Sequence, residues 1–288
     1  MSTAEQPSGT TLAEPAGRPS NVRLPSALNL GVRRARLELL QYFRQRDAVV
    51  FTFGYPLIML LIFGSIFSGN LQGTDIPYDQ YFTAGITATG MMSIGFQSVS
   101  IAIASDRTDK SIKRLRGLPM PQLSYFLGKL LAALVEGIIQ TTILIICAVV
   151  FFHVHLPTTA ERWFTLVWVF VLGLGTCASL GVLLGGWVKD GRTANAVTLP
   201  PFLVLQFISG VFFPLNQLSP TLRTIGGFFP LKWMCQGLRS VFLPNEALVA
   251  EPSRSWQLPE AALILAVWLV GSLLLATRTF RWKEKYER

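Results

Sequence analysis

The stretch YFLGKLLAALVEGIIQTTILIICAVVFF, Tyr125–Phe152, decides the fold class of this chain. It carries only two charged residues, Lys129 and Glu136. An α-helix rises about 1.5 Å per residue, so about 20 residues cross a hydrocarbon core about 30 Å thick. The stretch lacks the alternating apolar and polar residues of a membrane β-strand. It therefore predicts a membrane-spanning helix.

Five further stretches are apolar over a similar length. They are Ala48–Ser68, Tyr81–Ala104, Trp163–Val188, Ala196–Pro214 and Ala261–Thr277. The fourth of these is short and carries a Pro200–Pro201 pair, which is expected to kink it. The six stretches together predict an all-α integral membrane protein with six transmembrane helices.

The overall composition agrees with this class. Of the 288 residues, 51% are hydrophobic and 14% are charged, against roughly 25% charged residues in an average soluble domain. The three cysteines are too few for a disulfide framework, and we expect them to fill small spaces in the core. Residues 1–26 hold Pro, Gly, Ser and Thr without an apolar run, which predicts a disordered tail before one membrane domain, residues 27–288.

The basic residues predict the orientation in the membrane. On the expected topology, 20 of the 25 Lys and Arg residues lie on one side of the bundle. The positive-inside rule places that side in the cytosol, so both termini are expected in the cytosol. The protein itself is expected in the plasma membrane of the cell. The net charge of +9 is thereby explained by topology and contact with lipid. No basic soluble domain is visible, so no nucleic-acid partner is expected.

Three segments outside the spans are predicted to be helical. Ala27–Arg46 places Leu28, Val32 and Phe43 on one face among arginines, which favours a helix in the headgroup plane over a solvated juxtamembrane helix. The basic loop SDRTDKSIKRLRGLPMPQLSYFLGK, which starts at Ser105, predicts a short cytosolic helix, or else only a topological anchor. Leu215–Leu258 predicts outer helices too short to span, either re-entrant or interfacial.

Signatures of catalysis are missing. No G-x-x-x-x-G-K-[ST] stretch occurs, so no nucleotide site is expected in this chain. No G-x-S-x-G string occurs either, which argues against a membrane hydrolase. His153 and His155 could bind a metal ion, but no third ligand is evident nearby, so no metal site is expected.

Polar residues inside the spans are the candidates for a translocation path. Glu136 is the one carboxylate well inside a span, and an ionisable group there is costly. It belongs either to a translocation path or polar relay, or it has a structural role, hydrogen-bonded to a neighbouring helix or snorkelled to water. Gln97, Gln140 and Gln206 are its possible polar partners, and Gln97 and Gln206 complete the predicted path.

The chain from Ala27 onward resembles the permease subunits of type-2 ABC exporters, a family that includes drug- and antibiotic-resistance permeases. Three features carry the resemblance. An amphipathic helix leads into a span that contains Pro56, and the basic loop contains KRLRGLP, similar to the family pattern K-R-L-R-x-x-P. The outer stretch that begins ISGVFFP at Ile208 is similar to the family pattern SG-x-x-F-P followed by a later P-L.

The resemblance implies how such a chain is energised. The amphipathic stretch would be an elbow helix, and the outer helices of Leu215–Leu243 would be re-entrant. Residues Asp106–Leu118 would form a coupling helix seated in a separate ABC ATPase subunit, which would bind the ATP, so that this chain needs no cofactor and is no enzyme. The residues expected at this contact are Asp106, Arg107, Ile112, Lys113, Arg114, Leu115 and Arg116. Two permease chains, identical or different, would pair with two ATPase chains.

The family implies efflux of a hydrophobic or amphipathic substrate, such as a drug or antibiotic. Two alternatives stay open. The same machinery moves lipids or lipid-linked glycans in other members. A different class, a proton-coupled secondary transporter, would use Glu136 as the proton carrier, although such folds normally contain internal repeats.

Overall fold

The computed structural model describes residues 26–67, 69–71, 73–109 and 122–279. These residues are almost entirely helical, and the β pairing among them is limited to one bridge between Asn70 and Pro77. The first half contains α1 (Ala27–Arg44), α2 (Arg46–Ile66), α3 (Tyr78–Met92), η1 (Ser93–Ser98), α4 (Val99–Thr108) and α6 (Gln122–Phe152). The second half contains α7 (Ala160–Trp187), α8 (Gly191–Ile208), η2 (Leu215–Gln217), α9 (Pro220–Phe228), α10 (Pro230–Phe242), η3 (Asn245–Ala250) and α11 (Leu258–Thr279). The all-α prediction is confirmed.

Within the described residues, five helices are long and apolar enough to cross a membrane. They are Arg46–Ile66, Tyr78–Thr108, Ser124–Phe152, Ala160–Trp187 and Leu258–Arg278. The second is continuous through α3, the π-helical turn η1 and α4. Each agrees with a predicted span to within a few residues at either end, because a long apolar run fixes the centre of a helix better than its ends.

The remaining predicted span, Ala196–Pro214, corresponds to α8 and differs from the prediction at both ends. The helix begins at Gly191, where the side chain of Asp190 accepts a hydrogen bond from the backbone N–H of Thr193. It ends at Ile208, and Gly210 follows with φ of +78°. The segment after Ile208 therefore turns away, since few residues other than glycine adopt that backbone conformation. α8 is not among the five long apolar helices, so a sixth span stays a prediction.

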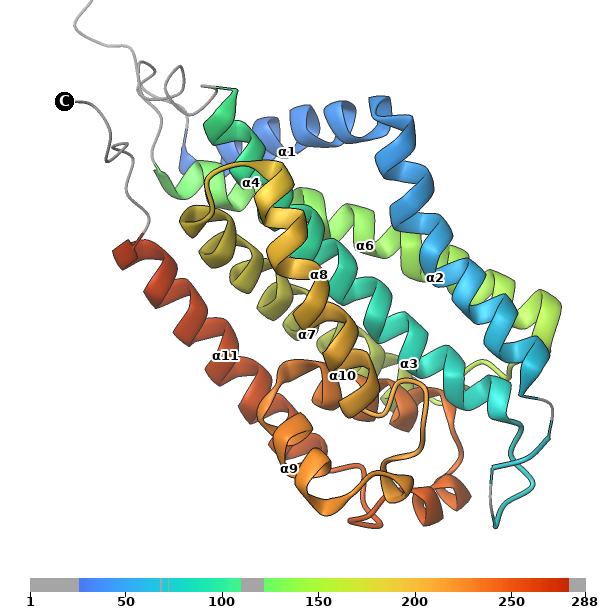
Figure 1. Cartoon of the computed structure of the whole chain (residues 1–288). Coiled ribbons are helices and arrows are strands. Elements are labelled where there is room, and N and C mark those ends of the chain that lie inside the picture. Colours follow the sequence, from blue (N-terminus) through green and yellow to red (C-terminus); the bar gives the residue numbers. More distant parts are fainter. Residues whose placement is uncertain (1–25, 68, 72, 110–121, 280–288) are drawn as a thin grey trace, which may run out of the picture.

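The helices form a bundle with two distinct ends (Figure 1). One end, which we call the inner end, contains α1, the last turn of α4, the start of α6 and the last turn of α11. We call the outer end the one that contains α9, α10 and η3. α8 runs from the inner end towards α9, so its course matches that of a sixth pass.

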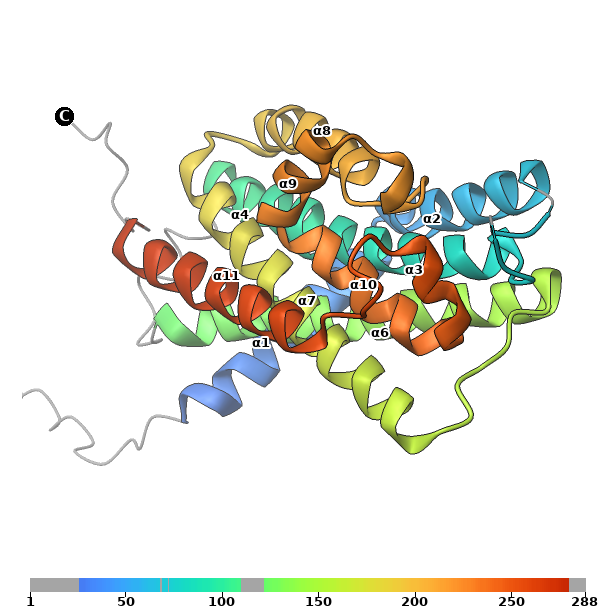
Figure 2. The same ribbon diagram turned by 90° about the horizontal axis from the view of Figure 1, so that it is seen from below.

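α7 lies in the middle of the bundle. It packs against α11, α10, α4, η1 and α6, and Figure 2 shows α2 and α11 at opposite edges with α7 between them. The span Tyr78–Thr108 approaches α7 very closely, because α7 has glycines at the contact. A Cβ atom on Gly181 would lie 3.1 Å from the carbonyl oxygen of Phe96, and one on Gly185 would lie 2.7 Å from that of Ser100. Small residues at such contacts drive helix association in membranes.

α1 lies across the inner end and packs along α6 (Figure 1). Its buried residues are Gly31, Ala35 and Glu38, whereas Leu28 and Val32 on its apolar side are 62% and 53% exposed. A helix is thus observed where the amphipathic helix was predicted, and the face that packs on the protein is the one with small and charged residues. The apolar face is left outward, as a helix in the headgroup plane would have it.

Candidate functional site

The inner end contains a cluster of four charged side chains from three helices. Arg34 and Glu38 come from α1, Asp106 from α4 and Lys129 from α6. The Nζ atom of Lys129 lies 2.7 Å from Oε2 of Glu38 and 2.9 Å from Oδ2 of Asp106. Arg34 Nη2 lies 2.5 Å from Glu38 Oε1 and 3.4 Å from Asp106 Oδ2. We call these four residues the inner charge cluster.

Tyr125 completes the inner charge cluster. Its hydroxyl donates a hydrogen bond to Asp106 at 2.9 Å. Its ring lies under both cations, with the Arg34 Cζ atom 5.5 Å and the Lys129 Nζ atom 5.7 Å from the ring centroid, within cation–π range. The charged side chains are 4–16% exposed, and two positive charges balance two negative ones. Balanced, multiply bonded charges of this kind can be held away from water.

The close approach of α1 and α6 explains why this cluster forms. Gly128 lies where the helices cross, and a Cβ atom there would come within 2.8 Å of the Cβ of Arg34. At the start of the same contact, Ser124 donates a hydrogen bond to the carbonyl of Ala27 at 3.0 Å. The short separation lets Arg34 and Glu38, one turn apart on α1, both reach the cluster around Lys129. The sequence does not reveal the roles of Arg34 and Glu38, because nothing in their spacing identifies a partner on α6.

Asp106 and Arg107 were predicted to lie at the start of the coupling helix, and their contact with an ATPase stays a prediction. Both lie in the last turn of α4, which runs on to Thr108. Asp106 belongs to the inner charge cluster, and Arg107 donates hydrogen bonds to the carbonyls of Gly186 and Val188 at 2.6 and 3.0 Å. These carbonyls lie at the C-terminal end of α7, where a cation is favourable. Each side chain is thus engaged inside the chain.

The other residues of the predicted coupling contact lie outside the described part. These are Ile112, Lys113, Arg114, Leu115 and Arg116. The structure does describe both sides of that segment. It leaves from the last turn of α4 and returns at the start of α6, and the inner charge cluster holds these two points and α1 together.

Glu136 lies on the same side of α6 as Lys129, two turns further along, and is 7% exposed. The ionisable groups of Lys129, Glu38 and Tyr42 lie close enough to Glu136 to interact with it electrostatically. The carboxylate of Glu136 makes no hydrogen bond or ion pair with another residue in the described part of the chain. The predicted structural hydrogen bond to a neighbouring helix is therefore not observed in that part of the chain.

The two glutamines of the predicted path differ in their surroundings. Gln97 lies in the π-helical turn η1, is half-buried, and accepts a hydrogen bond from Ser93 at 3.4 Å. Gln206 on α8 is buried and accepts a hydrogen bond from the Tyr55 hydroxyl at 3.0 Å. No hydrogen bond joins Gln97, Gln206 and Glu136 to one another in the described part of the chain. Their common role in a path stays a prediction.

The outer end contains one fully buried ion pair. Arg239 on α10 lies 2.8 Å from Glu251, which follows η3, and their side chains are 0% and 2% exposed. Arg239 also donates to the carbonyl of Gly210 and stacks on Tyr81 of α3, with Cζ 4.3 Å from the ring centroid. Tyr81 itself donates to the same carbonyl at 3.1 Å. The pair therefore ties α10 to α3 and to the turn after α8.

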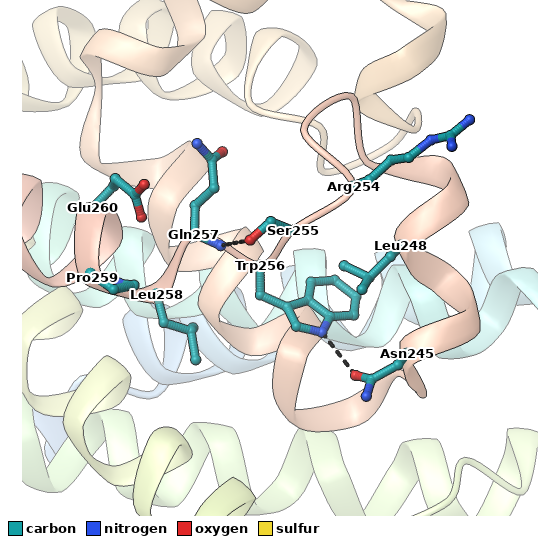
Figure 3. Close-up of a pocket in the computed structure, with 9 residues that line it drawn as sticks. All are labelled: Asn245, Leu248, Arg254, Ser255, Trp256, Gln257, Leu258, Pro259 and Glu260. Atoms are coloured by element: carbon teal, nitrogen blue, oxygen red, sulfur yellow. Dashed lines mark hydrogen bonds between the residues drawn. The ribbon is translucent and has the colours of Figure 1, made fainter.

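An open pocket lies at the outer end, between η3 and the start of α11 (Figure 3). Trp256 lies across it and donates a hydrogen bond to Asn245 at 3.2 Å. Arg254, Gln257 and Glu260 also line it. None of the residues that line it was predicted to belong to the translocation path, so it does not help to place that path.

The potential metal ligands are few. In the described part of the chain, no group of three or more His, Cys, Asp or Glu side chains is arranged to hold a metal ion. Cys177 and Cys235 are buried and Cys147 is half-buried, and all three are free thiols.

These features define a multi-pass helical membrane protein in which charges at one end of the bundle join α1 to both sides of the first basic loop. A family model described as ABC-2 type transporter matches residues 35–243, and the chain belongs to that family. The matched region runs from within α1 to the end of α10. It includes the inner charge cluster except Arg34, and it includes Arg239 of the outer ion pair but not Glu251. A comparison with curated proteins gave no match.

Proposed function

We propose that this chain is the permease subunit of an ATP-driven exporter in the plasma membrane, with both termini in the cytosol and α8 as its sixth span. It hydrolyses no ATP itself and receives energy from a separate ABC ATPase. Its substrate is hydrophobic or amphipathic, such as a drug or antibiotic. Membership of the ABC-2 type transporter family supports the transporter class.

The observation that carries the proposal is the inner charge cluster. A permease without a nucleotide site must receive movement through a cytosolic contact that is firmly joined to its spans. The predicted coupling segment begins in the last turn of α4, where Asp106 lies, and the cluster links Asp106 to α1 through Arg34 and to α6 through Lys129. A push on this segment would therefore move three helices together.

A second permease chain is part of the proposal. α2 and α8 carry apolar side chains that are exposed in the single chain, among them Phe51, Ile58, Val204 and Phe207. The remaining exposed apolar faces, on α11 for example, suit lipid. A partner chain on α2 and α8 would enclose Tyr55 and Gln206 between two copies, where a path requires polar groups.

The coupling contact is tested with Leu115→Asp. Apolar residues at the centre of an interface usually carry most of its binding energy, whereas exposed rim charges carry little. The variant should insert into the membrane but lose copurification of the ATPase and ATP-dependent uptake of substrate into inverted vesicles. Lys113→Ala is the matched control and should keep most of both. Full binding and transport by Leu115→Asp would contradict the proposed coupling.

One observation favours a second candidate, a proton-coupled secondary transporter. The side chain of Glu136 is buried and has no hydrogen-bond partner in the described part of the chain. A carboxylate without a fixed partner suits a proton carrier that is exposed alternately to the two sides of the membrane. Glu136→Gln keeps the size and hydrogen-bonding capacity of the side chain but cannot carry a proton. Uptake driven by a pH gradient without ATP, and abolished in the variant, would support the secondary transporter. Loss of uptake on removal of ATP alone supports the exporter.

A further inference from the structure

Pro56 leaves one backbone carbonyl of α2 without its helical partner. In an α-helix the N–H of residue 56 would bind the carbonyl of Thr52, four residues earlier, and proline has no N–H. α2 continues without a break through this position, from Arg46 to Ile66. Inside a membrane an unpaired carbonyl is costly, so such a helix needs a donor from elsewhere.

Gln140 of α6 supplies that donor. Its side-chain amide nitrogen lies 2.8 Å from the carbonyl oxygen of Thr52. Gln140 is 2% exposed, so no bulk water competes for the carbonyl. On its other side Gln140 packs against Gly90 of α3, where a Cβ atom would lie 3.1 Å from the amide carbon and oxygen. The glycine therefore makes the space in which the amide reaches α2.

The same place holds the other polar connection of α2. Among the described residues, two side-chain hydrogen bonds join α2 to other helices, from Gln140 to Thr52 and from Tyr55 to Gln206. Both fall within the four residues before Pro56. α2 is otherwise the least buried of the five long apolar helices, with 11% of its apolar window buried against 72% for the span Tyr78–Thr108. The side-chain hydrogen bonds that α2 makes with other described helices are therefore concentrated just before Pro56.

The two halves of α2 have different attachments. The half before Pro56 follows α1 after the single residue Gln45, and α1 is held by the inner charge cluster. The half after Pro56 packs through Leu60 and Phe63 against Phe82 of α3 and other residues of the outer half of the bundle. Proline is the commonest cause of a bend between two such halves.

We propose that Pro56 is a hinge between these halves and that Gln140 is the positioning residue that holds it, by donating to the carbonyl which Pro56 leaves unpaired. This role rests on the proposed transport function, because the movement it serves is that of α1 and α2 during the transport cycle. The hydrogen bond from Gln140 to the Thr52 carbonyl, and its dependence on Pro56, do not depend on the proposed transport function.

The first experiment is a double-mutant cycle on the stability of the purified full chain in mixed micelles, titrated with sodium dodecyl sulfate. Gln140→Leu should lower the ratio of folded to unfolded protein about threefold to tenfold, the usual size of an interhelical hydrogen bond in a membrane. In a Pro56→Ala background the N–H of residue 56 binds the Thr52 carbonyl, so Gln140→Leu should then have little effect. Equal losses in both backgrounds would overturn the assignment.

Thr176→Val is the matched control. The hydroxyl of Thr176 in α7 also reaches a carbonyl of another helix, that of Leu265 in α11, at 2.9 Å, and shares its proton between that carbonyl and the Leu172 carbonyl of its own helix at 2.7 Å. The Leu265 carbonyl keeps its own helical partner, because residue 269 is a leucine, which, unlike proline, has a backbone N–H to donate. Thr176→Val should therefore cause the same small loss in the wild-type and the Pro56→Ala backgrounds. A control that differs between backgrounds would show that Pro56→Ala disturbs the whole bundle, and the assignment would fail.

The second experiment measures ATP hydrolysis by the complex of this chain with its ATPase, as a function of ATP concentration. Pro56→Ala should lower kcat several-fold at unchanged KM for ATP, while the permease is at least as stable as the wild type. A purely structural proline would show no such split. Full kcat in a stable Pro56→Ala complex would overturn the hinge. A wild-type complex that hydrolyses no ATP would instead refute the proposed exporter, and the micelle cycle would still decide the role of Gln140.

Discussion

The two ends of the bundle bury charge in different ways. At the inner end, Asp106 and Glu38 each contact both cations, and the anions and cations come from three helices. At the outer end a single cation, Arg239, is bound to a single anion, Glu251. Both ends contain buried polar atoms without a hydrogen-bond partner in the described structure, Arg34 Nε and Glu38 Oε1 at the inner end and Arg239 Nε and Glu251 Oε2 at the outer end. The two ends therefore differ in the number of oppositely charged partners that each ion has.

This difference indicates how each end responds when one charge is lost. In the inner charge cluster, a remaining ion still has a partner of opposite sign. At the outer end, the remaining ion has no ion-pair partner among the described residues, and an unpaired buried charge is strongly destabilising. We therefore expect the outer end to be rigid and intolerant of substitution, and the inner end to tolerate rearrangement, which the proposed coupling movement would require.

The largest effect is expected for Arg239→Met. Methionine keeps much of the volume but leaves Glu251 buried and unpaired, which costs about 3–5 kcal/mol of stability. The measurement is the denaturant midpoint of the purified chain in mixed micelles. Adding Glu251→Gln should restore part of the loss, because the neutral amide needs no counter-ion. If the double variant is less stable than Arg239→Met, Glu251 has another partner and the comparison between the two ends fails.

A smaller effect is expected for Asp106→Asn in the inner charge cluster. Lys129 and Arg34 keep Glu38 as their anion, and the amide oxygen can still accept from Tyr125, so the expected loss is about 1 kcal/mol. The same denaturant titration measures it. A loss as large as that of Arg239→Met would show that the cluster does not share its charges.

The smallest effect concerns Lys232 in the first turn of α10. Its Nζ atom lies 3.4 Å from the ring centroid of Trp233, and burial lowers its pKa to about 8. The folded state therefore binds this proton more weakly than the unfolded chain, so the contribution of Lys232 to stability rises from pH 8 towards the usual lysine pKa of about 10.5.

Lys232→Met isolates this contribution. The variant should gain about 1–2 °C in melting temperature relative to the wild type at about pH 7, and the gain should shrink at about pH 9.5. Differential scanning fluorimetry of both proteins at the two pH values gives the difference. A gain that grows with pH would mean that the ammonium is stabilised at the outer end, contrary to its burial.

The sequence predicted the spans well and their polar contacts poorly. Long apolar runs identify membrane helices because the bilayer core imposes both length and apolarity. α1 shows the limit. Its apolar stripe was predicted, yet in a membrane protein that stripe faces outward at Leu28 and Val32, and the residues that pack on the protein are Gly31, Ala35 and Glu38.

Partners across helices could not be predicted from one sequence. Proline chemistry alone identifies the Thr52 carbonyl as unpaired, four residues before Pro56. Nothing in the spacing shows that Gln140, rather than Gln97 or Gln206, reaches it. The end of α8 was placed too late in the chain for a similar reason, because Val211–Pro214 is apolar but follows the left-handed turn at Gly210.

The π-helical turn η1 has a consequence for the register of its span. A π-helical turn holds one more residue than the α-helical turn it replaces, and each residue of an α-helix turns the chain by about 100°. The faces of α3 and α4 are therefore out of phase with each other, although one unbroken helix carries both. Gly95 lies inside this turn, directly against Cys177 and Ala178 of α7. The extra residue in this span therefore rotates α4 relative to α3. As a result, the face of α3 that packs on α10 and the face of α4 that packs on α7 and α8 are not continuous along the helix.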